Sequence, residues 1–305
     1  MSMAETSFET EVDGGRVVVH ELAKGVPGGP TVVAAHGITA NALMWQPLAD
    51  ALARRRPDVR VLAPDLRGRA DSRDVGGPRG LAAHAADLLV LVRSLGTRPL
   101  LVGHSMGAFV TGLAAATDPA AVSGVVLVDG GLAFPTPPDL DVDAALQAVI
   151  GPAMERLSLR FDDLDAYVAF WQRHPALGPL LDGPAGGAVR RYLAHDLVRS
   201  DDAWVSSCRL DVVRADGADV LADAQTHAAV GHAVAAGVPV ELVWAARGLL
   251  DEPQGLYDEG RLAALAVPAD VRVTGVDGNH YSVVLTDPGV SAVLDAVERL
   301  LPAAE

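Results

Sequence analysis

Short apolar segments alternate with longer amphipathic segments through roughly the first 130 residues of the chain. The short segments are rich in β-branched residues, as strands are, and the longer ones repeat their apolar positions every three or four residues, as helices do. The pattern predicts strands at 16–23, 31–36, 59–65, 100–104 and 122–129, and helices at 43–56, 80–95 and 106–117. This alternation favours a mostly parallel α/β sheet with crossover helices.

Two of these segments, LLVGHS and GVVLVDGG, are apolar without alternation, which predicts strands buried on both faces in the middle of the sheet. The same pattern returns after residue 238. It predicts strands at 240–246 and 271–276 and a final helix at 287–301, with Asp287 as its cap and Pro288 in its first turn. Residues 1–131 and 238–305 are therefore expected to form one discontinuous core domain.

Residues 132–237 differ in character from both flanking parts. The segment opens with the proline-rich run FPTPPDLD and then shows helical spacing with few strand signals. Helices are predicted at 142–156, 163–173, 187–199 and 218–235. Because the segment is too long for a loop, we expect an inserted helical cap or lid that covers the carboxyl edge of the sheet.

Composition narrows the class of protein. Half of the 305 residues are apolar, and 24 Lys and Arg stand against 39 Asp and Glu, for a net charge of −15. Such a chain folds into a globule and repels phosphate backbones and anionic lipids, so neither nucleic acid nor a membrane is an expected partner. One cysteine, no signal peptide and no membrane-spanning run predict a cytoplasmic protein.

The strongest local motif is GHSMG at 103–107, directly after an apolar strand and directly before a helix. Two glycines allow a sharp strand-to-helix turn that projects the hydroxyl of Ser105 above the sheet edge, which makes it a candidate nucleophile. His36-Gly37-Ile38 ends an upstream strand that is expected to lie beside it. The backbone N–H groups of Ile38 and Met106 are therefore candidates for an oxyanion hole.

Four motifs in order along the chain resemble those of the α/β-hydrolase family: HGITAN, DLRGRADS at 65–72, GHSMG, and GNHYSVVL at 278–285. The resemblance implies an eight-stranded, mostly parallel sheet whose first two strands are N-terminal, with Ser105 as nucleophile and His280 as general base. His280 also fits on its own, because it follows the last predicted strand, at the edge where open sheets bind ligands.

The acid of the expected catalytic triad is less well defined. In much of that family it follows the strand after the cap, in a Trp-Gly-x-x-Asp pattern, whereas this chain has WAARG at 244–248. Asp129 ends the strand after the nucleophile strand, and Asp251 lies three residues beyond the empty position. Haloalkane dehalogenases and some lactone-hydrolysing relatives are similar in carrying the acid at the earlier strand, so Asp129 is favoured and Asp251 is the alternative.

A serine at the turn favours acyl transfer through an acyl-enzyme. The expected activity is hydrolysis of a carboxylic ester or lactone of a small apolar molecule; the alternatives are a thioester or carbon–carbon bond hydrolase, or a small-molecule receptor on the same fold. The chain lacks GxGxxG after its first strand, GxxxxGK[ST] and HExxH, so no cofactor and no metal is expected. A homodimer is a possible assembly. Six aromatic residues of the cap are candidates for a pocket lining or for its core: Phe134, Phe161, Tyr167, Phe170, Trp171 and Tyr192.

Overall fold

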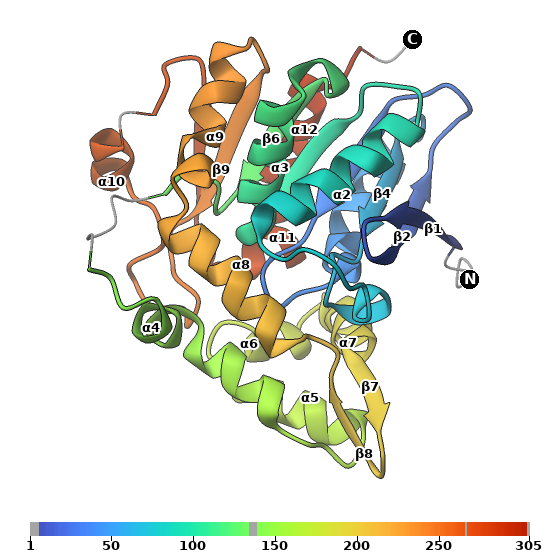
Figure 1. Cartoon of the computed structure of the whole chain (residues 1–305), viewed down its shortest axis with the longest axis vertical. Coiled ribbons are helices and arrows are strands. Elements are labelled where there is room, and N and C mark those ends of the chain that lie inside the picture. The colour runs from blue at the N-terminus through green and yellow to red at the C-terminus, as the bar shows by residue number, and fades with distance from the viewer. Residues whose placement is uncertain (1–5, 134–138, 266, 304–305) are drawn as a thin grey trace.

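A computed structural model describes residues 6–133, 139–265 and 267–303, and Figure 1 shows an open twisted sheet with helices on both faces. The sheet has eight strands in the order β1-β2-β4-β3-β5-β6-β9-β10. Their bounds are β1 Thr6–Val12, β2 Gly15–Lys24, β3 Thr31–Ala35, β4 Arg60–Pro64, β5 Leu100–His104, β6 Gly124–Val128, β9 Val240–Ala245 and β10 Arg272–Val276. β2 is antiparallel to β1 and β4, and the other neighbours are parallel. The predicted fold class is confirmed.

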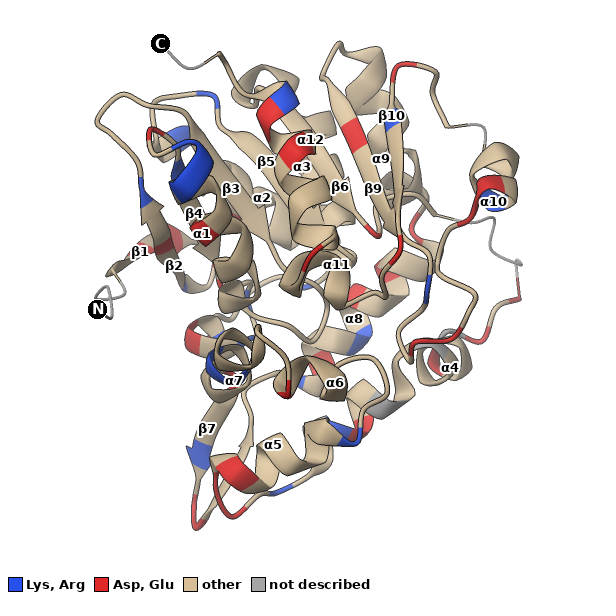
Figure 2. Ribbon diagram, turned by 180° about the vertical axis from the view of Figure 1, so that it is seen from behind, with Lys and Arg blue, Asp and Glu red and all other residues tan. Residues whose placement is uncertain are grey.

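The central strands are apolar throughout because each separates two cores. In β3, Val32 belongs to one core cluster and Val33 to the other, and Leu100 and Leu101 of β5 divide in the same way. All five residues of β5 and of β6 are buried, as their continuous apolar runs predicted. The cores are closed by α1 Gln46–Arg55 and α12 Gly289–Leu300 on one face, and by α2 Leu81–Ser94, α3 Met106–Thr117 and α9 Ala224–Ala235 on the other (Figures 1 and 2).

The predicted cap segment lies between β6 and β9. It contains α4 Val142–Glu155, η4 Arg156–Ser158, α5 Leu164–Gln172, α6 Gly178–Leu181, α7 Gly186–His195, β7 Leu197–Ser200, β8 Ala203–Ser206, α8 Leu210–Ala222 and α9. In Figure 1 the elements from α4 to α8 lie together beyond one edge of the sheet, whereas α9 packs beside α3. Helices therefore cover that edge as an insert.

Two local predictions for this segment were wrong. A helix was expected to run to residue 199, but it ends at His195 and the chain enters the antiparallel β7–β8 hairpin, whose turn contains Asp201 with φ 55°. One helix was expected at 218–235, but α8 begins at Leu210 and breaks before α9. Asp223 causes the break, since its backbone is extended and its carboxylate accepts a hydrogen bond from the amide of Thr226 at 2.7 Å.

The insert is joined to the core by buried polar contacts. Arg156 pairs with Asp196 within the insert and donates a hydrogen bond to the carbonyl of Thr39 at 2.9 Å. Arg69 of the core pairs with Asp216 of α8 at 2.6 Å, and both side chains are fully buried. A buried ion pair is favourable only when its charged groups are in good hydrogen-bonding geometry. These contacts therefore define the position of the insert on the loops that carry Thr39 and Arg69.

The remaining elements are short. They are η1 Ala42–Trp45, η2 Ala70–Ser72, η3 Pro119–Ala121, α10 Glu259–Ala264 and α11 Ser282–Leu285. The predicted helix at 43–56 thus begins as the 3₁₀ turn η1, and the final helix begins at Gly289 after Pro288, with the Asp287 carboxylate accepting from the amide of Ser291 at 3.1 Å. Among the described residues, none of the helices is long and apolar enough to cross a bilayer.

Candidate active site

Ser105 lies in a tight turn between β5 and α3, with φ 54° and ψ −122°. This backbone conformation is costly for a non-glycine residue and is found where neighbouring structure enforces it. A Cβ on Gly103 would lie 2.2 Å from the carbonyl oxygen of Gly107, and one on Gly107 would lie 2.2 Å from that of Ala35. The two glycines of the motif are therefore required by close backbone packing, which holds the serine at the carboxyl edge of the sheet.

Asp129 follows β6 and is completely buried. Its Oδ2 lies 2.6 Å from Nδ1 of His280, and its Oδ1 accepts a hydrogen bond from the amide of Ala245 at 3.1 Å. A carboxylate in this position accepts a hydrogen bond from Nδ1–H, which keeps the proton on Nδ1 and leaves the lone pair of the ring on Nε2. The pair thus has the geometry that orients a histidine base.

Whereas Asp129 lies on the loop that follows β6, the alternative acid Asp251 lies on the loop that follows β9. Its Oδ1 accepts hydrogen bonds from Arg247 Nε at 2.8 Å and from Asn279 Nδ2 at 3.0 Å. Its side chain is 41% exposed. The structure therefore brings Asp129, and not Asp251, to the imidazole of His280.

Ser105, Asp129 and His280 line one cavity of about 340 Å³. Ile38 and Met106, the residues expected to supply the oxyanion hole, line it as well. Most other lining side chains are aliphatic, and the insert contributes Leu140, Ala145, Leu146, Ile150, Gly217, Val220 and Leu221. No lysine or arginine is found among the lining residues that the structure describes. The cavity suits an uncharged, apolar molecule.

The described aromatic residues of the insert belong to the hydrophobic core and do not line the cavity. Phe161, Tyr167, Trp171 and Tyr192 are buried in a core cluster, with Phe170 packed against it, and none of the five lines the cavity. Phe134 lies outside the described residues. The same cluster contains Trp45 and Val283 of the core domain, so these aromatic residues extend the hydrophobic core of one sheet face into the insert.

His36 supports the loop that carries Ile38. Its Nδ1 donates to the carbonyl of Gly37 at 2.8 Å, and its Nε2 accepts from the amide of Leu66 at 2.9 Å. Burial lowers the pKa of His36 to about 3, so the ring is neutral near pH 7 and both of its nitrogens are used structurally. Burial likewise holds the pKa of His104 well below its usual value, and its Nε2 donates to the carbonyl of His280 at 2.8 Å.

Two residues of the site, Gly130 and Tyr257, were not predicted from the sequence. A Cβ on Gly130 would lie 2.3 Å from the carbonyl oxygen of Ser105, so this glycine lets the two loops meet. Tyr257 lines the cavity and its hydroxyl donates to the carbonyl of Leu132 at 2.7 Å. The Asp-Gly-Gly run at 129–131 follows an apolar strand directly, and this pattern indicates a tight approach at Gly130. No sequence pattern indicates that Tyr257 lines the cavity.

The chain matches a family whose description is the alpha/beta hydrolase fold, over residues 30–178. It is 35% identical over 110 residues to Lipase LipV of Mycobacterium tuberculosis and 36% identical over 121 residues to 2-(acetamidomethylene)succinate hydrolase of Mesorhizobium japonicum. These alignments cover 35% and 39% of this chain and 40% and 41% of the relatives. The chain therefore spans about two fifths of the curated relatives it matches.

The structural similarity extends further along the chain. The crystal structure of E-2-(acetamidomethylene)succinate hydrolase superposes with a TM-score of 0.72 and 24% identity, covering 97% of this chain and 98% of that one. At this identity the likeness establishes a shared fold.

Proposed function

We propose that the chain is a serine hydrolase of the α/β-hydrolase family that cleaves a carboxylic ester or lactone of a small apolar molecule, and the match to that fold over residues 30–178 supports the proposal. The observation that carries the proposal is the buried His280–Asp129 pair, which shares one apolar cavity with the strained Ser105. A serine becomes a nucleophile when a histidine base and a carboxylate are arranged beside it in this way.

In the proposed reaction, Ser105 Oγ attacks the substrate carbonyl while His280 Nε2 takes its proton. Asp129 holds the Nδ1 proton and stabilises the imidazolium that forms. The backbone N–H groups of Ile38 and Met106 stabilise the negative oxygen of the tetrahedral intermediate. His280 then protonates the leaving alcohol, the acyl group remains on Ser105, and a water activated by His280 releases the acid.

The cavity wall supports the proposed class of substrate. A dicarboxylate of the kind named for two of the similar proteins needs cationic partners when its carboxylates are buried, and the described wall offers none. Aliphatic side chains from both the core and the insert instead favour a neutral acyl group. We propose that the insert controls access to Ser105, because it supplies much of this wall.

A fluorophosphonate probe tests the nucleophile. The wild-type chain is expected to gain the mass of one adduct and to hydrolyse short-chain p-nitrophenyl esters, and Ser105→Ala is expected to do neither. Ser94→Ala, at the exposed end of α2, is the matched control and should behave as wild type. An adduct that persists in Ser105→Ala contradicts the proposal. If the probe labels Ser105 but the protein hydrolyses no ester, lactone or thioester, the result favours a small-molecule receptor.

A further inference from the structure

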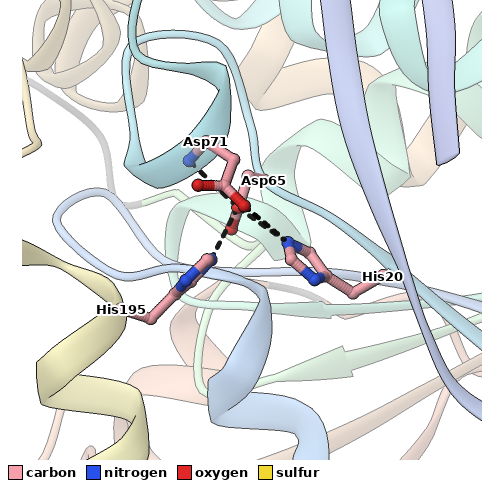
Figure 3. Close-up of side chains that lie close together, drawn as sticks. All are labelled: His20, Asp65, Asp71 and His195. Carbon is pink, nitrogen blue, oxygen red and sulfur yellow. Dashed lines mark hydrogen bonds and ion pairs between the residues drawn. The ribbon is translucent and has the colours of Figure 1, made fainter. Parts of the chain in front are cut away.

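Four side chains outside the cavity converge on one point: His20, Asp65, Asp71 and His195 (Figure 3). His20 lies on β2, Asp65 follows β4, Asp71 belongs to η2, and His195 ends α7 of the insert. One ligand atom from each lies within 4.8 Å of all the others. The cluster therefore joins the core to the insert through groups that are all able to bind a metal ion.

The distances within the cluster match those between the ligands of one small ion. Asp65 Oδ2 lies 3.0 Å from His20 Nε2 and 2.8 Å from His195 Nε2, and His20 Nε2 lies 3.8 Å from Asp71 Oδ2. Tetrahedral bonds of about 2.0–2.1 Å to zinc place neighbouring ligand atoms about 3.3 Å apart. The three separations lie on both sides of that value and the other pairs lie within 4.8 Å, so the side chains need to shift their ligand atoms to reach tetrahedral geometry.

The two imidazoles approach from different directions. Their rings are 4.9 Å apart at 89°, and both point Nε2 toward the carboxylate of Asp65, as Figure 3 shows. Nδ1 of His20 is buried with no hydrogen-bond partner among the described residues. No contact on the far side of that ring therefore opposes moving its proton to Nδ1, which frees Nε2 to bind a metal.

Burial and charge also favour a cation. The side chain of Asp65 is fully buried and that of His20 nearly so, while the Asp71 side chain is 55% exposed and leaves a path from solvent. Both oxygens of the Asp65 carboxylate face hydrogen-bond donors, since Oδ1 accepts from the amide of Ala42 at 2.9 Å and Oδ2 lies next to the two imidazoles. A buried, ionised carboxylate gains most from a compensating positive charge.

We propose that His20, Asp65, Asp71 and His195 bind one zinc ion, which fastens α7 of the insert to the core. Two imidazole nitrogens and two carboxylate oxygens suit zinc, whereas calcium and magnesium prefer oxygen alone. Four protein ligands leave no open position, as in structural zinc sites. The site has no short sequence motif, because its ligands come from positions 20, 65, 71 and 195 and meet only in the fold.

Calorimetric titration of the EDTA-treated full-length chain with Zn²⁺ tests the site. One ion per chain is expected to bind, and Asp71→Asn and His195→Gln are expected to weaken binding by about tenfold or more. Asp74→Asn and His232→Gln replace exposed residues of the same types outside the cluster and should bind as wild type. Asp71 is exposed, so its variant is expected to stay folded, which circular dichroism checks.

Two further readouts do not depend on enzyme activity. Zinc should raise the Tm of the wild-type chain and of both controls, and should raise it much less in Asp71→Asn. Co²⁺ in the site should give the intense visible absorption of four-coordinate cobalt. Absence of saturable binding, equal binding by all four variants, or the weak spectrum of six-coordinate cobalt would each overturn the proposal.

Discussion

The Oδ2 atom of Asp129 lies 2.6 Å from Nδ1 of His280, although 151 positions separate the two residues along the chain. Both side chains are buried, and Asp129 is held from its other oxygen by the amide of Ala245. Asp129 follows β6 and His280 follows β10, and both strands are parallel neighbours of β9, so their carboxyl ends meet at one edge of the sheet. The sheet order therefore selects this carboxylate as the partner of the histidine.

The first prediction separates the two candidate acids. Asp129→Asn is expected to lower kcat by about 10⁴-fold with little change in KM, because the carboxylate acts on the imidazole and not on bound substrate. Asp251→Asn should stay within about tenfold of wild type, since that residue contacts Arg247 and Asn279. Steady-state kinetics on one p-nitrophenyl ester measures both. The reverse order of effects would assign the acid to Asp251.

The second prediction concerns the packing of Gly130 against the serine turn. Gly130→Ala would place its Cβ 2.3 Å from the carbonyl oxygen of Ser105, so one of the two loops must move. We expect a loss of about 10²-fold in kcat/KM, and a loss of about 1–3 kcal/mol in the free energy of unfolding.

Gly231→Ala is the matched control for that variant. Gly231 lies within α9 with no atom near its missing Cβ, so alanine should leave activity unchanged and raise the free energy of unfolding by up to about 1 kcal/mol. Kinetics and urea denaturation of both variants provide the measurement. A fully active Gly130→Ala would show that the serine turn tolerates displacement.

Sequence patterns predicted the sheet well because its signals are local. The apolar runs of β5 and β6 and the glycines of the serine turn each report a feature within a few residues of themselves. The identity of the partner carboxylate needed the order of the strands. With Trp244 followed by alanine where related chains have glycine, local pattern alone left Asp129 and Asp251 both open.

Local sequence patterns did not predict the features that depend on contacts between distant segments of the chain. The β7–β8 hairpin is a short edge structure whose residues Leu197 and Val198 continue the apolar spacing of α7, so the sequence looked helical through the turn. Tyr257 reaches the cavity wall only because its loop folds back to Leu132. His20 and His195 carried no motif, and only the packing of the insert on the core brings them to Asp65.

The third prediction follows from the neutral His36. An unfolded chain protonates this histidine near pH 6.5, whereas burial delays protonation of the native ring to about pH 3. The unfolded state therefore binds more protons between these values, and stability falls as pH is lowered through that window. Between pH 7 and pH 5, His36 should account for about 2 kcal/mol of lost unfolding free energy.

His36→Gln tests this contribution by urea denaturation at the two pH values. The variant should lose less stability than wild type on going from pH 7 to pH 5, by about that amount. His232→Gln, which replaces an exposed histidine on α9, should keep the wild-type difference. Equal pH dependence in all three proteins would mean that the native ring of His36 accepts a proton as readily as the unfolded one.

The fourth prediction uses two adjacent leucines to test whether the cavity sets the size of the acyl group. Leu249 lines the cavity, whereas Leu250 is 44% exposed. Leu249→Trp fills part of a space of only about 340 Å³, so a long acyl chain should lose methylene contacts that an acetyl group never makes. Since each methylene in an apolar pocket changes kcat/KM by about tenfold or more, the preference should shift sharply toward short esters.

The measurement compares kcat/KM for p-nitrophenyl acetate and octanoate in both variants. Leu249→Trp should retain acetate hydrolysis and lose octanoate hydrolysis by at least about tenfold, and Leu250→Trp should leave their ratio unchanged. Because both substitutions add the same indole to the same loop, a general disturbance of the loop would alter both ratios alike. Identical ratios in wild type and Leu249→Trp would show instead that the acyl group binds outside the cavity that contains Ser105.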